Sequence, residues 1–214
     1  MTVAGALVEV EIRGAVALVT LNRPEALNAL DRALTGELGR VAERLASEPG
    51  LKVVVTRGAG RAFCAGNDLK ETATLTPREA EAFATAQGLL LDRWAALPLI
   101  TLAAVGGVAL GGGLVLAASH DLRMAADGAR FGLPEITLGW PPAYGIHRLV
   151  RLIGEARARE LARLPEGGIK ATKRVLAGIV GPVRGGEPRA FAACLADDEA
   201  QTRIRSFLEQ RKRR

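Results

Sequence analysis

Two glycine-rich stretches are the residues of this chain best suited to chemistry. The first, AAVGGVALGGG at 103–113, is an expected strand that runs into three successive glycines and then into a helix-like run, Leu114–Ser119. Such a junction gathers free backbone N–H groups and the positive end of a helix dipole at one point, which suits a developing negative charge. A glycine triplet taken alone is more often explained by close packing of a helix on a sheet.

A second glycine loop strengthens the chemical interpretation. RGAGRAFCAGND at 57–68 directly follows the β-branched run VVVT at 53–56. Two buried parallel strands that each end in such a loop can aim one N–H donor apiece at the same atom. Because paired donors of this kind make an oxyanion hole, the two loops together predict one.

Glu135 is the carboxylate with the most unusual surroundings. It lies in FGLPEITL at 131–138, where nearly all its neighbours are apolar. Burial there raises the pKa of a carboxyl group toward the value that a general acid–base needs. An exposed loop glutamate after a proline fits the same residues equally well, so both interpretations stay open at this point.

Other motifs point elsewhere, but each is incomplete. Gly58-Ala59-Gly60 after a strand has the start of a dinucleotide-binding turn, yet its third glycine falls at Phe63, which leaves an NAD-binding oxidoreductase as a weak alternative. The run Ser119-His120-Asp121 contains the components of a hydrolytic triad. Adjacent side chains project in different directions, so we interpret this run as chance adjacency.

Composition limits the class of protein. The 214 residues are 49% hydrophobic, enough for one domain with a substantial core, and no apolar stretch has the length of a membrane span. We therefore expect a cytoplasmic protein that does not bind membranes. Two cysteines and two histidines supply neither a disulfide framework nor a metal site. The net charge of +6 favours anionic partners, but 4% aromatic residues argue against nucleic acid.

The periodicity of apolar residues predicts an α/β protein. The predicted strands are 7–13, 16–21, 53–56, 99–105 and 122–125, the first two joined by a tight turn at Gly14. The predicted helices begin at the N-cap Asp31 and at a capping box, Thr76–Glu79, and then run over 155–164, 169–179 and 188–210.

Taken together, four stretches resemble the signature motifs of one family. LNRPEALNAL at 21–30, VVVTRGAGRAFCAGNDLKE at 53–71, AAVGGVALGGG at 103–113 and ARFGLPEITLG at 129–139 are similar to those of the crotonase superfamily, also called the enoyl-CoA hydratase/isomerase family. The C-terminal runs IKATKRVLAGI and IRSFLEQRKRR resemble the closing helices of that family.

The resemblance implies a crotonase-like α/β fold and a mode of assembly. Repeated β-β-α turns would wind into a spiral catalytic core over 1–154, and the helical region 155–214 of the same domain would build homotrimers, commonly paired into homohexamers. The apolar positions Phe191, Leu195, Ile204, Phe207 and Leu208 fit an assembly surface on an otherwise charged segment. The alternative is that they only close the subunit's own core.

The resemblance also implies an acyl-CoA thioester substrate, with coenzyme A entering as part of that substrate, no further cofactor and no metal. The thioester oxygen would accept hydrogen bonds from the N–H groups of Ala65 and Gly112, with Glu135 as the acid–base. The implied substrate-binding residues are Arg23, Ala26, Leu27, Ala62, Phe63, Gly66, Asn67, Asp68, Leu69, Gly111, Val115, Pro134 and Tyr144.

Two departures from the family bear on the reaction. Hydratases of the family carry a first glutamate where this chain has Val115, so only Glu135 matches their pair. One base suffices to move a double bond, and the one-glutamate pattern therefore favours enoyl-CoA isomerisation. Hydration remains the alternative, with hydrolysis or decarboxylation of an acyl-CoA as sibling reactions. The chain is also short after Glu155, which either a natural deletion or a segment missing from the sequence explains.

Overall fold

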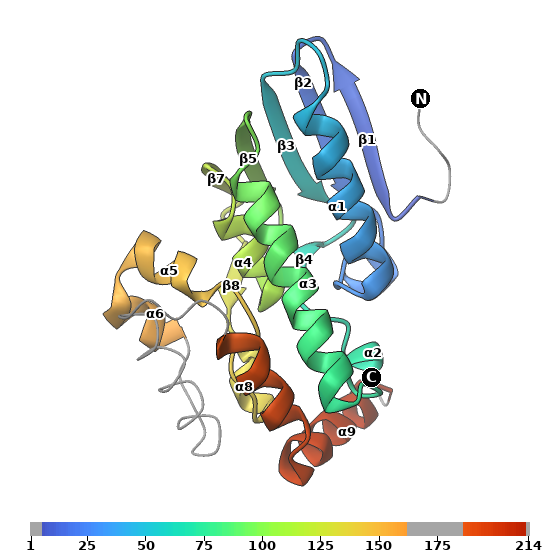
Figure 1. Cartoon of the computed structure of the whole chain (residues 1–214), viewed down its shortest axis with the longest axis vertical. Helices are drawn as coiled ribbons and strands as arrows, with labels where there is room; N and C mark the ends of the chain where they lie inside the picture. The colour runs from blue at the N-terminus through green and yellow to red at the C-terminus, as the bar shows by residue number, and fades with distance from the viewer. Residues whose placement is uncertain (1–5, 162–185, 213–214) are drawn as a thin grey trace. The chain divides into compact units, whose positions relative to one another are not determined.

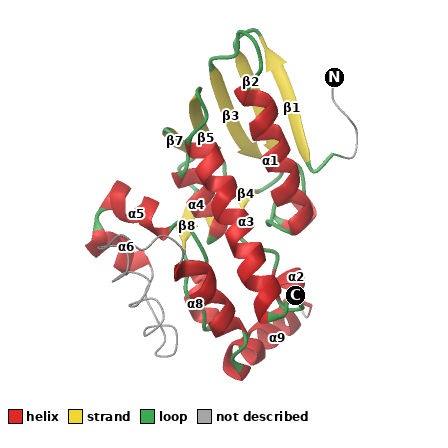
Figure 2. Ribbon diagram, viewed as in Figure 1, coloured by secondary structure: helices red, strands yellow, loops and turns green. Residues whose placement is uncertain are grey.

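The computed structural model describes residues 6–161 and 186–212 (Figure 1). The strands are β1 (Val8–Arg13), β2 (Val16–Leu21), β3 (Val53–Gly58), β4 (Ala62–Cys64), β5 (Ile100–Val105), β6 (Val108–Leu110), β7 (Leu122–Ala125) and β8 (Arg130–Gly132). The α-helices are α1 (Arg32–Ala46), α2 (Leu69–Thr72), α3 (Pro77–Ala95), α4 (Gly112–Ala118), α5 (Ile146–Ile153), α6 (Glu155–Leu161), α8 (Gly186–Leu195) and α9 (Asp198–Lys212), and two 3-10 helices are η1 (Pro24–Ala26) and η2 (Pro134–Leu138). Figure 2 shows the mixture of helices and strands that the sequence predicted.

The chain divides into two compact units. The first unit consists of Met1–Asn67 and Leu89–Phe131, and the second consists of Asp68–Gly88 and Gly132–Arg214. None of the helices in the described part of the chain is long and apolar enough to cross a membrane.

A five-stranded sheet in the order β1-β2-β3-β5-β7 dominates the first unit. The predicted hairpin turns at Gly14, whose φ of 58° favours glycine, and β2, β3, β5 and β7 then run parallel. Helix α1 lies against this sheet (Figure 1) and buries one apolar side, which includes Leu34, Leu38 and Leu45. It begins at the predicted N-cap, because the carboxylate of Asp31 accepts the N–H of Leu34 at 2.7 Å.

The strand predicted over 99–105 is confirmed as β5, but it does not continue to the three glycines at 111–113. β5 ends at Val105, and after Gly106 and Gly107 the chain starts β6, which belongs to a separate three-stranded sheet in the order β4-β6-β8. A Cβ on Gly107 would lie 2.1 Å from the carbonyl oxygen of Arg61. Only glycine therefore allows the chain to pass from one sheet to the other here.

Helices dominate the second unit. Trp140, which follows η2, packs edge-on against Phe191 of α8 with ring centroids 5.5 Å apart. Phe191, Leu195 and Ile204 are buried, whereas Phe207 is 39% exposed. Most of the stripe proposed for assembly therefore closes the core of the chain itself, as the alternative interpretation had it.

Helix boundaries in the second unit differ from the prediction at two places. The segment predicted as one helix over 188–210 breaks between α8 and α9, where the carboxylate of Asp197 accepts the N–H of Glu199 at 2.8 Å and starts a new helix. Helix α5 was not predicted at all. The capping box is confirmed, with the Thr76 N–H 2.9 Å from the Glu79 carboxylate. The predicted helix at 169–179 lies outside the described residues.

Candidate functional site

The two glycine loops lie against one another in the first unit. β4 and β6, which precede them, pair in parallel. A Cβ on Gly66 would lie 2.8 Å from the carbonyl oxygen of Leu110 and 3.3 Å from the amide nitrogen of Gly112. A Cβ on Gly113 would lie only 2.1 Å from the carbonyl oxygen of Cys64. The predicted convergence of two loops is thus present, at the ends of β4 and β6, and glycine makes it possible.

The backbone donors in the first loop have specific acceptors. The N–H of Ala65 donates to the carbonyl oxygen of Leu27 at 3.0 Å. The N–H of Gly66 faces the thiol of Cys64, and burial raises the pKa of that thiol to about 12. The hydrogen bond to Leu27 argues against Ala65 as an oxyanion donor, because its N–H already has a partner. The next N–H along this loop belongs to Asn67, which forms a parallel bridge with Leu30.

Gly112 stands at the other loop as the first residue of α4, behind the N-cap Gly111, whose φ is 53°. Hydrogen bonding within α4 starts with the N–H of Val115, which donates to Gly111 at 3.1 Å. The N–H of Gly112 therefore has no acceptor inside its own helix. The family resemblance implies that this N–H donates to the thioester oxygen of the substrate, and this role of Gly112 stays a prediction.

Asn28 anchors the loop that supplies the Leu27 carbonyl. Its buried side chain accepts the N–H of Arg23 at 2.8 Å and donates to the carbonyl oxygens of Ala59 and Ala62, both at 2.9 Å. Leu27 and Asn28 both have a φ of 55°, a left-handed conformation that asparagine tolerates better than most residues. The sequence analysis did not single out Asn28, although an asparagine in a loop after a strand is a recognisable signal for such a turn.

Arg23, expected to contact coenzyme A, is held by the same loop. Its guanidinium donates to the carbonyl oxygen of Ala29 at 2.6 Å and forms an ion pair with Asp31 at 3.0 Å. These contacts fix the arginine side chain at the start of α1. Whether it also binds phosphate stays a prediction.

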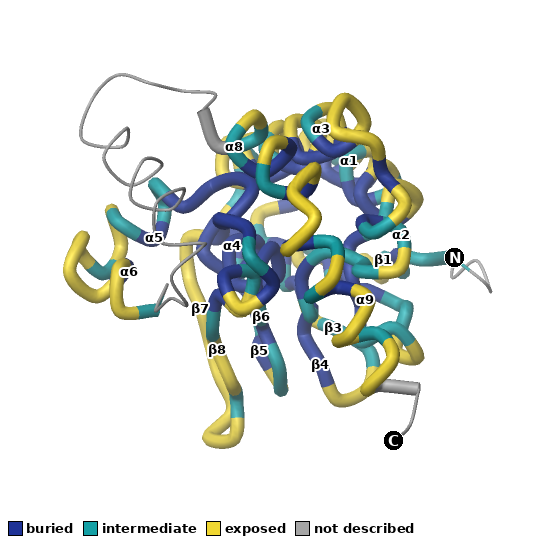
Figure 3. The backbone as a smooth tube through the Cα atoms, turned by 90° about the horizontal axis from the view of Figure 1, so that it is seen from below, coloured by how far each residue is buried: buried dark blue, intermediate teal, exposed yellow. Residues whose placement is uncertain are grey.

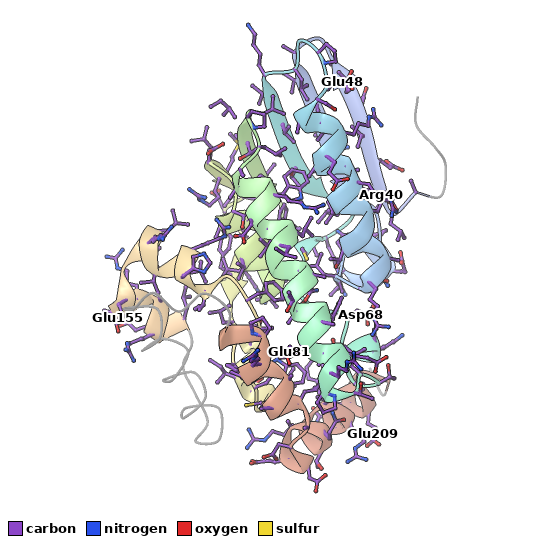
Figure 4. All side chains as sticks on the ribbon, viewed as in Figure 1. Arg40, Glu48, Asp68, Glu81, Glu155 and Glu209 are labelled. Carbon is purple, nitrogen blue, oxygen red and sulfur yellow. The ribbon has the colours of Figure 1, made fainter. Side chains whose placement is uncertain are left out.

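The other expected substrate-binding residues divide between the two units. Ala62, Phe63, Gly111 and Val115 are buried in the first unit, which also contains the half-buried Ala26 and Leu27. Asp68, Leu69, the exposed Pro134 and the buried Tyr144 belong to the second unit. Asp68 (Figure 4) caps α2 by accepting the N–H of Lys70 at 3.0 Å, and Phe63 is 0% exposed, so both have structural roles.

Glu135 lies in η2 of the second unit and is not an exposed loop glutamate. Its side chain is half-buried, but the Oε2 atom is fully buried and has no hydrogen-bond partner among the described residues. Burial raises the pKa of Glu135 from its ordinary value of 4.5 to about 7. A carboxyl group that ionises near neutrality can both take and return a proton, so the acid–base interpretation now has a physical basis.

The apparent Ser119-His120-Asp121 triad is excluded, as predicted. The hydroxyl of Ser119 donates to the carbonyl oxygen of Val115 at 2.9 Å, and the carboxylate of Asp121 accepts from Thr101 at 2.8 Å. The three side chains therefore serve separate structural contacts.

His120 itself is part of the core. It stacks on Trp94 at 5.4 Å, its Nδ1 donates to the carbonyl oxygen of Leu116 at 2.8 Å, and Nε2 lies 2.8 Å from the hydroxyl of Thr56. Burial lowers the pKa of His120 to about 4, which makes it neutral at physiological pH. No cluster of metal-ligating side chains occurs within the described ranges.

Comparison with known proteins identifies the class of protein and then the family. The fold is crotonase-like: an enoyl-CoA hydratase from Bacillus anthracis superposes with a TM-score of 0.71 at 28% identity, covering 95% of this chain and 90% of that one. A family model for enoyl-CoA hydratase/isomerase matches residues 11–187. The chain belongs to the enoyl-CoA hydratase/isomerase family.

Curated relatives agree on the family. A probable enoyl-CoA hydratase of Mycobacterium tuberculosis is 44% identical over 162 residues, which cover 75% of this chain and 62% of that protein. A short-chain-enoyl-CoA hydratase of Clostridium acetobutylicum is 38% identical over 175 residues, covering 81% and 67%. This chain thus spans less than two thirds of the length of the mycobacterial relative.

Proposed function

We propose that this chain acts on an acyl-CoA thioester, that it stabilises the thioester enolate, and that Glu135 is its acid–base. The observation that carries the proposal is the buried carboxyl group of Glu135, with its pKa of about 7, in a member of the enoyl-CoA hydratase/isomerase family. Coenzyme A enters only as part of the substrate, and the chemistry needs no other cofactor.

The glycine loops supply the enolate-stabilising donors in this proposal. The N–H of Gly112 is one donor. The second donor is a backbone N–H of the first glycine loop after Cys64, where Gly66 packs against Gly112. Donors fixed by packed backbone need no reorganisation when negative charge develops on the thioester oxygen, and this is the condition for effective stabilisation.

The favoured reaction is migration of a double bond in an enoyl-CoA. Glu135 removes a proton from the α carbon of a 3-enoyl-CoA, the electron pair is delocalised onto the thioester oxygen as an enolate, and the same carboxyl returns the proton to the γ carbon to give the 2-enoyl-CoA. Val115, at the position of the family's first glutamate, is 1% exposed and cannot hold or activate a water molecule. One carboxyl group is enough for this sequence of proton transfers.

Hydration of a 2-enoyl-CoA is the second candidate, because both curated relatives described above bear the name enoyl-CoA hydratase. The two reactions are separated by offering the protein 2-enoyl-CoA and 3-enoyl-CoA in parallel. We expect conversion of the 3-enoyl-CoA to the 2-enoyl isomer to exceed formation of 3-hydroxyacyl-CoA. Faster hydration by the unmodified protein would return the assignment to a hydratase.

Glu135→Gln tests the acid–base assignment. The substitution keeps the shape of the side chain and removes the base, so exchange of the substrate's α and γ protons with solvent should fall by about 10²-fold or more while thioester binding persists. Glu25→Gln is a matched control, since Glu25 also follows a proline in a 3-10 helix but is exposed. Equal exchange rates in the wild type and Glu135→Gln would remove Glu135 from the mechanism.

A further inference from the structure

Two consecutive residues at the end of η2 each contact a different helix of the second unit. Gly139, with a φ of 90°, ends η2, and a Cβ placed there would lie 3.4 Å from the Cα atom of Ala200 in α9. Trp140 contacts α8 instead, because its ring packs edge-on against Phe191. The segment that carries Glu135 is therefore held at its end by two helices that lie far from it in the sequence.

Both contacts are buried. Trp140 is 2% exposed, Phe191 0% and Ala200 2%. Most of α9 is exposed (Figure 3), but Ala200 and Ile204 are buried and lie one helical turn apart, so they form the side of α9 that packs on its own chain. Edge-on aromatic rings also attract one another beyond the effect of burial. The end of η2 is thus packed as tightly as the core.

Helices α8 and α9 are also fixed to one another. The side-chain amide of Gln201 in α9 donates to the carbonyl oxygen of Leu195 in α8 at 2.8 Å. Between the two helices, the carboxylate of Asp197 accepts the N–H of Glu199 at 2.8 Å. Hydrogen bonds therefore define the corner between the helices, and the two contacts with η2 are linked through it.

The end of η2 is bonded back to Glu135. The N–H of Trp140 donates to the carbonyl oxygen of Glu135 at 3.3 Å, and the N–H of Gly139 donates to that of Ile136 at 3.1 Å. One backbone hydrogen bond thus connects Glu135 to the residue whose ring packs on Phe191. A displacement of Trp140 must move the backbone from which the Glu135 carboxyl group projects.

We propose that Phe191 and Ala200 are positioning residues for Glu135. Each acts through its contact with the end of η2, and together they keep the carboxyl group buried and oriented toward the substrate. The proposal rests on the acid–base role proposed for Glu135 above. It gives α8 and α9, which the family resemblance assigned to assembly, a role in the chemistry of their own chain.

Burial is the main cause of the raised pKa of Glu135, and hydrogen bonding to its own backbone opposes it. The charged side chains on the two helices have other partners within the described residues: Arg203 of α9 pairs with Glu199, and Arg189 of α8 pairs with Glu81 at 3.1 Å. A loosened η2 therefore changes this pKa through water. Solvent that reaches the carboxyl group lowers its pKa toward the ordinary value of 4.5.

Phe191→Leu and Ala200→Val test the two contacts separately. The first removes the aromatic ring but keeps an apolar side chain, and the second adds two methyl groups against Gly139. Each should lower kcat about tenfold and change KM less than about twofold, because misplacing a base slows proton transfer more than it weakens binding. The rise of kcat/KM with pH, which follows ionisation of Glu135 at about pH 7, should shift by about one unit to lower pH.

Leu38→Ala and Ala42→Val are matched controls, because these residues are 0% and 1% exposed in α1 of the first unit. A cavity in one control and overpacking in the other should lower the unfolding midpoint and leave the pH profile unchanged. If Phe191→Leu and Ala200→Val likewise lower only the unfolding midpoint, their role is merely structural and the proposal is overturned.

A direct titration separates this proposal from the proposed function. In protein made with isotope-labelled glutamate, the carboxyl resonance that disappears in Glu135→Gln reports the pKa of Glu135 by NMR without any turnover. A pKa that falls in Phe191→Leu and Ala200→Val, beside a fully active Glu135→Gln, would support the hold on η2 and refute the acid–base role. An unchanged pKa in both variants, beside an inactive Glu135→Gln, would overturn the positioning role and keep the acid–base role.

Discussion

Replacing Glu135 with glutamine is expected to stabilise the protein at alkaline pH while removing its activity. The carboxyl group has a pKa of about 7 in the folded chain and 4.5 as its ordinary value. One pKa unit corresponds to about 1.4 kcal/mol, so complete ionisation of Glu135 costs the folded state about 3 kcal/mol.

The sign follows from which state binds the proton more tightly. Because the pKa of Glu135 is raised on folding, its contribution to stability is fully present below pH 4.5 and is lost as the pH rises through about 7. Glutamine does not titrate and keeps the neutral shape. The variant should therefore exceed the wild type in free energy of unfolding by about 1 kcal/mol at pH 5 and by about 3 kcal/mol at pH 8.

Urea unfolding followed by circular dichroism, at several pH values between 5 and 8, measures this difference. Glu25→Gln is the control here too, because Glu25 is exposed and also follows a proline in a 3-10 helix; its difference from the wild type should stay near zero throughout. A Glu135→Gln difference that does not change with pH, or that shrinks as the pH rises, would refute the argument that desolvation raises this pKa.

Two further predictions concern the first unit. Gly113→Ala should destabilise the protein by about 3 kcal/mol or more, because the new Cβ would lie 2.1 Å from the backbone oxygen of Cys64. Gly106→Ala is the control, since a Cβ there would meet no described atom within 4 Å, and it should change the unfolding midpoint little. Equal unfolding midpoints for the two variants would contradict the packing of the two loops. Burial lowers the pKa of His120 from 6.5 to about 4, so the free energy of unfolding of the wild type should fall by about 3 kcal/mol as the pH drops from 6.5 to below 4. In the same urea titration, a His120→Gln variant should lose less free energy of unfolding over this pH range.

Features that depend on neighbouring residues could be predicted from the sequence. The caps at Asp31 and Thr76 are side-chain hydrogen bonds to residues three positions away, and both are confirmed. Asp197 gives the same kind of signal, and overlooking it merged α8 and α9 into one predicted helix. The glycine loops were likewise predicted from their own residues to follow parallel strands, although the strands that directly precede them are β4 and β6.

Features that depend on distant backbone could not be predicted. The break between β5 and β6 exists because Gly107 packs on the carbonyl of Arg61, a contact between residues far apart in the sequence. The hydrogen bond from Ala65 to Leu27 is of the same kind, and it engages the N–H that the family resemblance assigned to the thioester oxygen. Hydrophobic periodicity contains no information about which backbone groups such contacts engage.

Two features that cost stability, a left-handed backbone at non-glycine residues and a buried carboxyl oxygen, lie in segments that match the family motifs. Leu27 and Asn28 are the non-glycine residues with positive φ in the described part of the chain, and they hold the carbonyl that engages Ala65. Glu135 keeps a buried carboxyl oxygen that has no partner in the part of the chain that the structure describes, and its ionisation costs stability above neutral pH. Strained backbone and an unsatisfied buried acid persist in a protein only where the surrounding structure enforces them, and they concentrate at functional sites. The loss of stability at each of these positions is therefore an argument for function that does not depend on the motifs. It also explains why Glu135→Gln, the variant expected to be inactive, is expected to be more stable than the wild type.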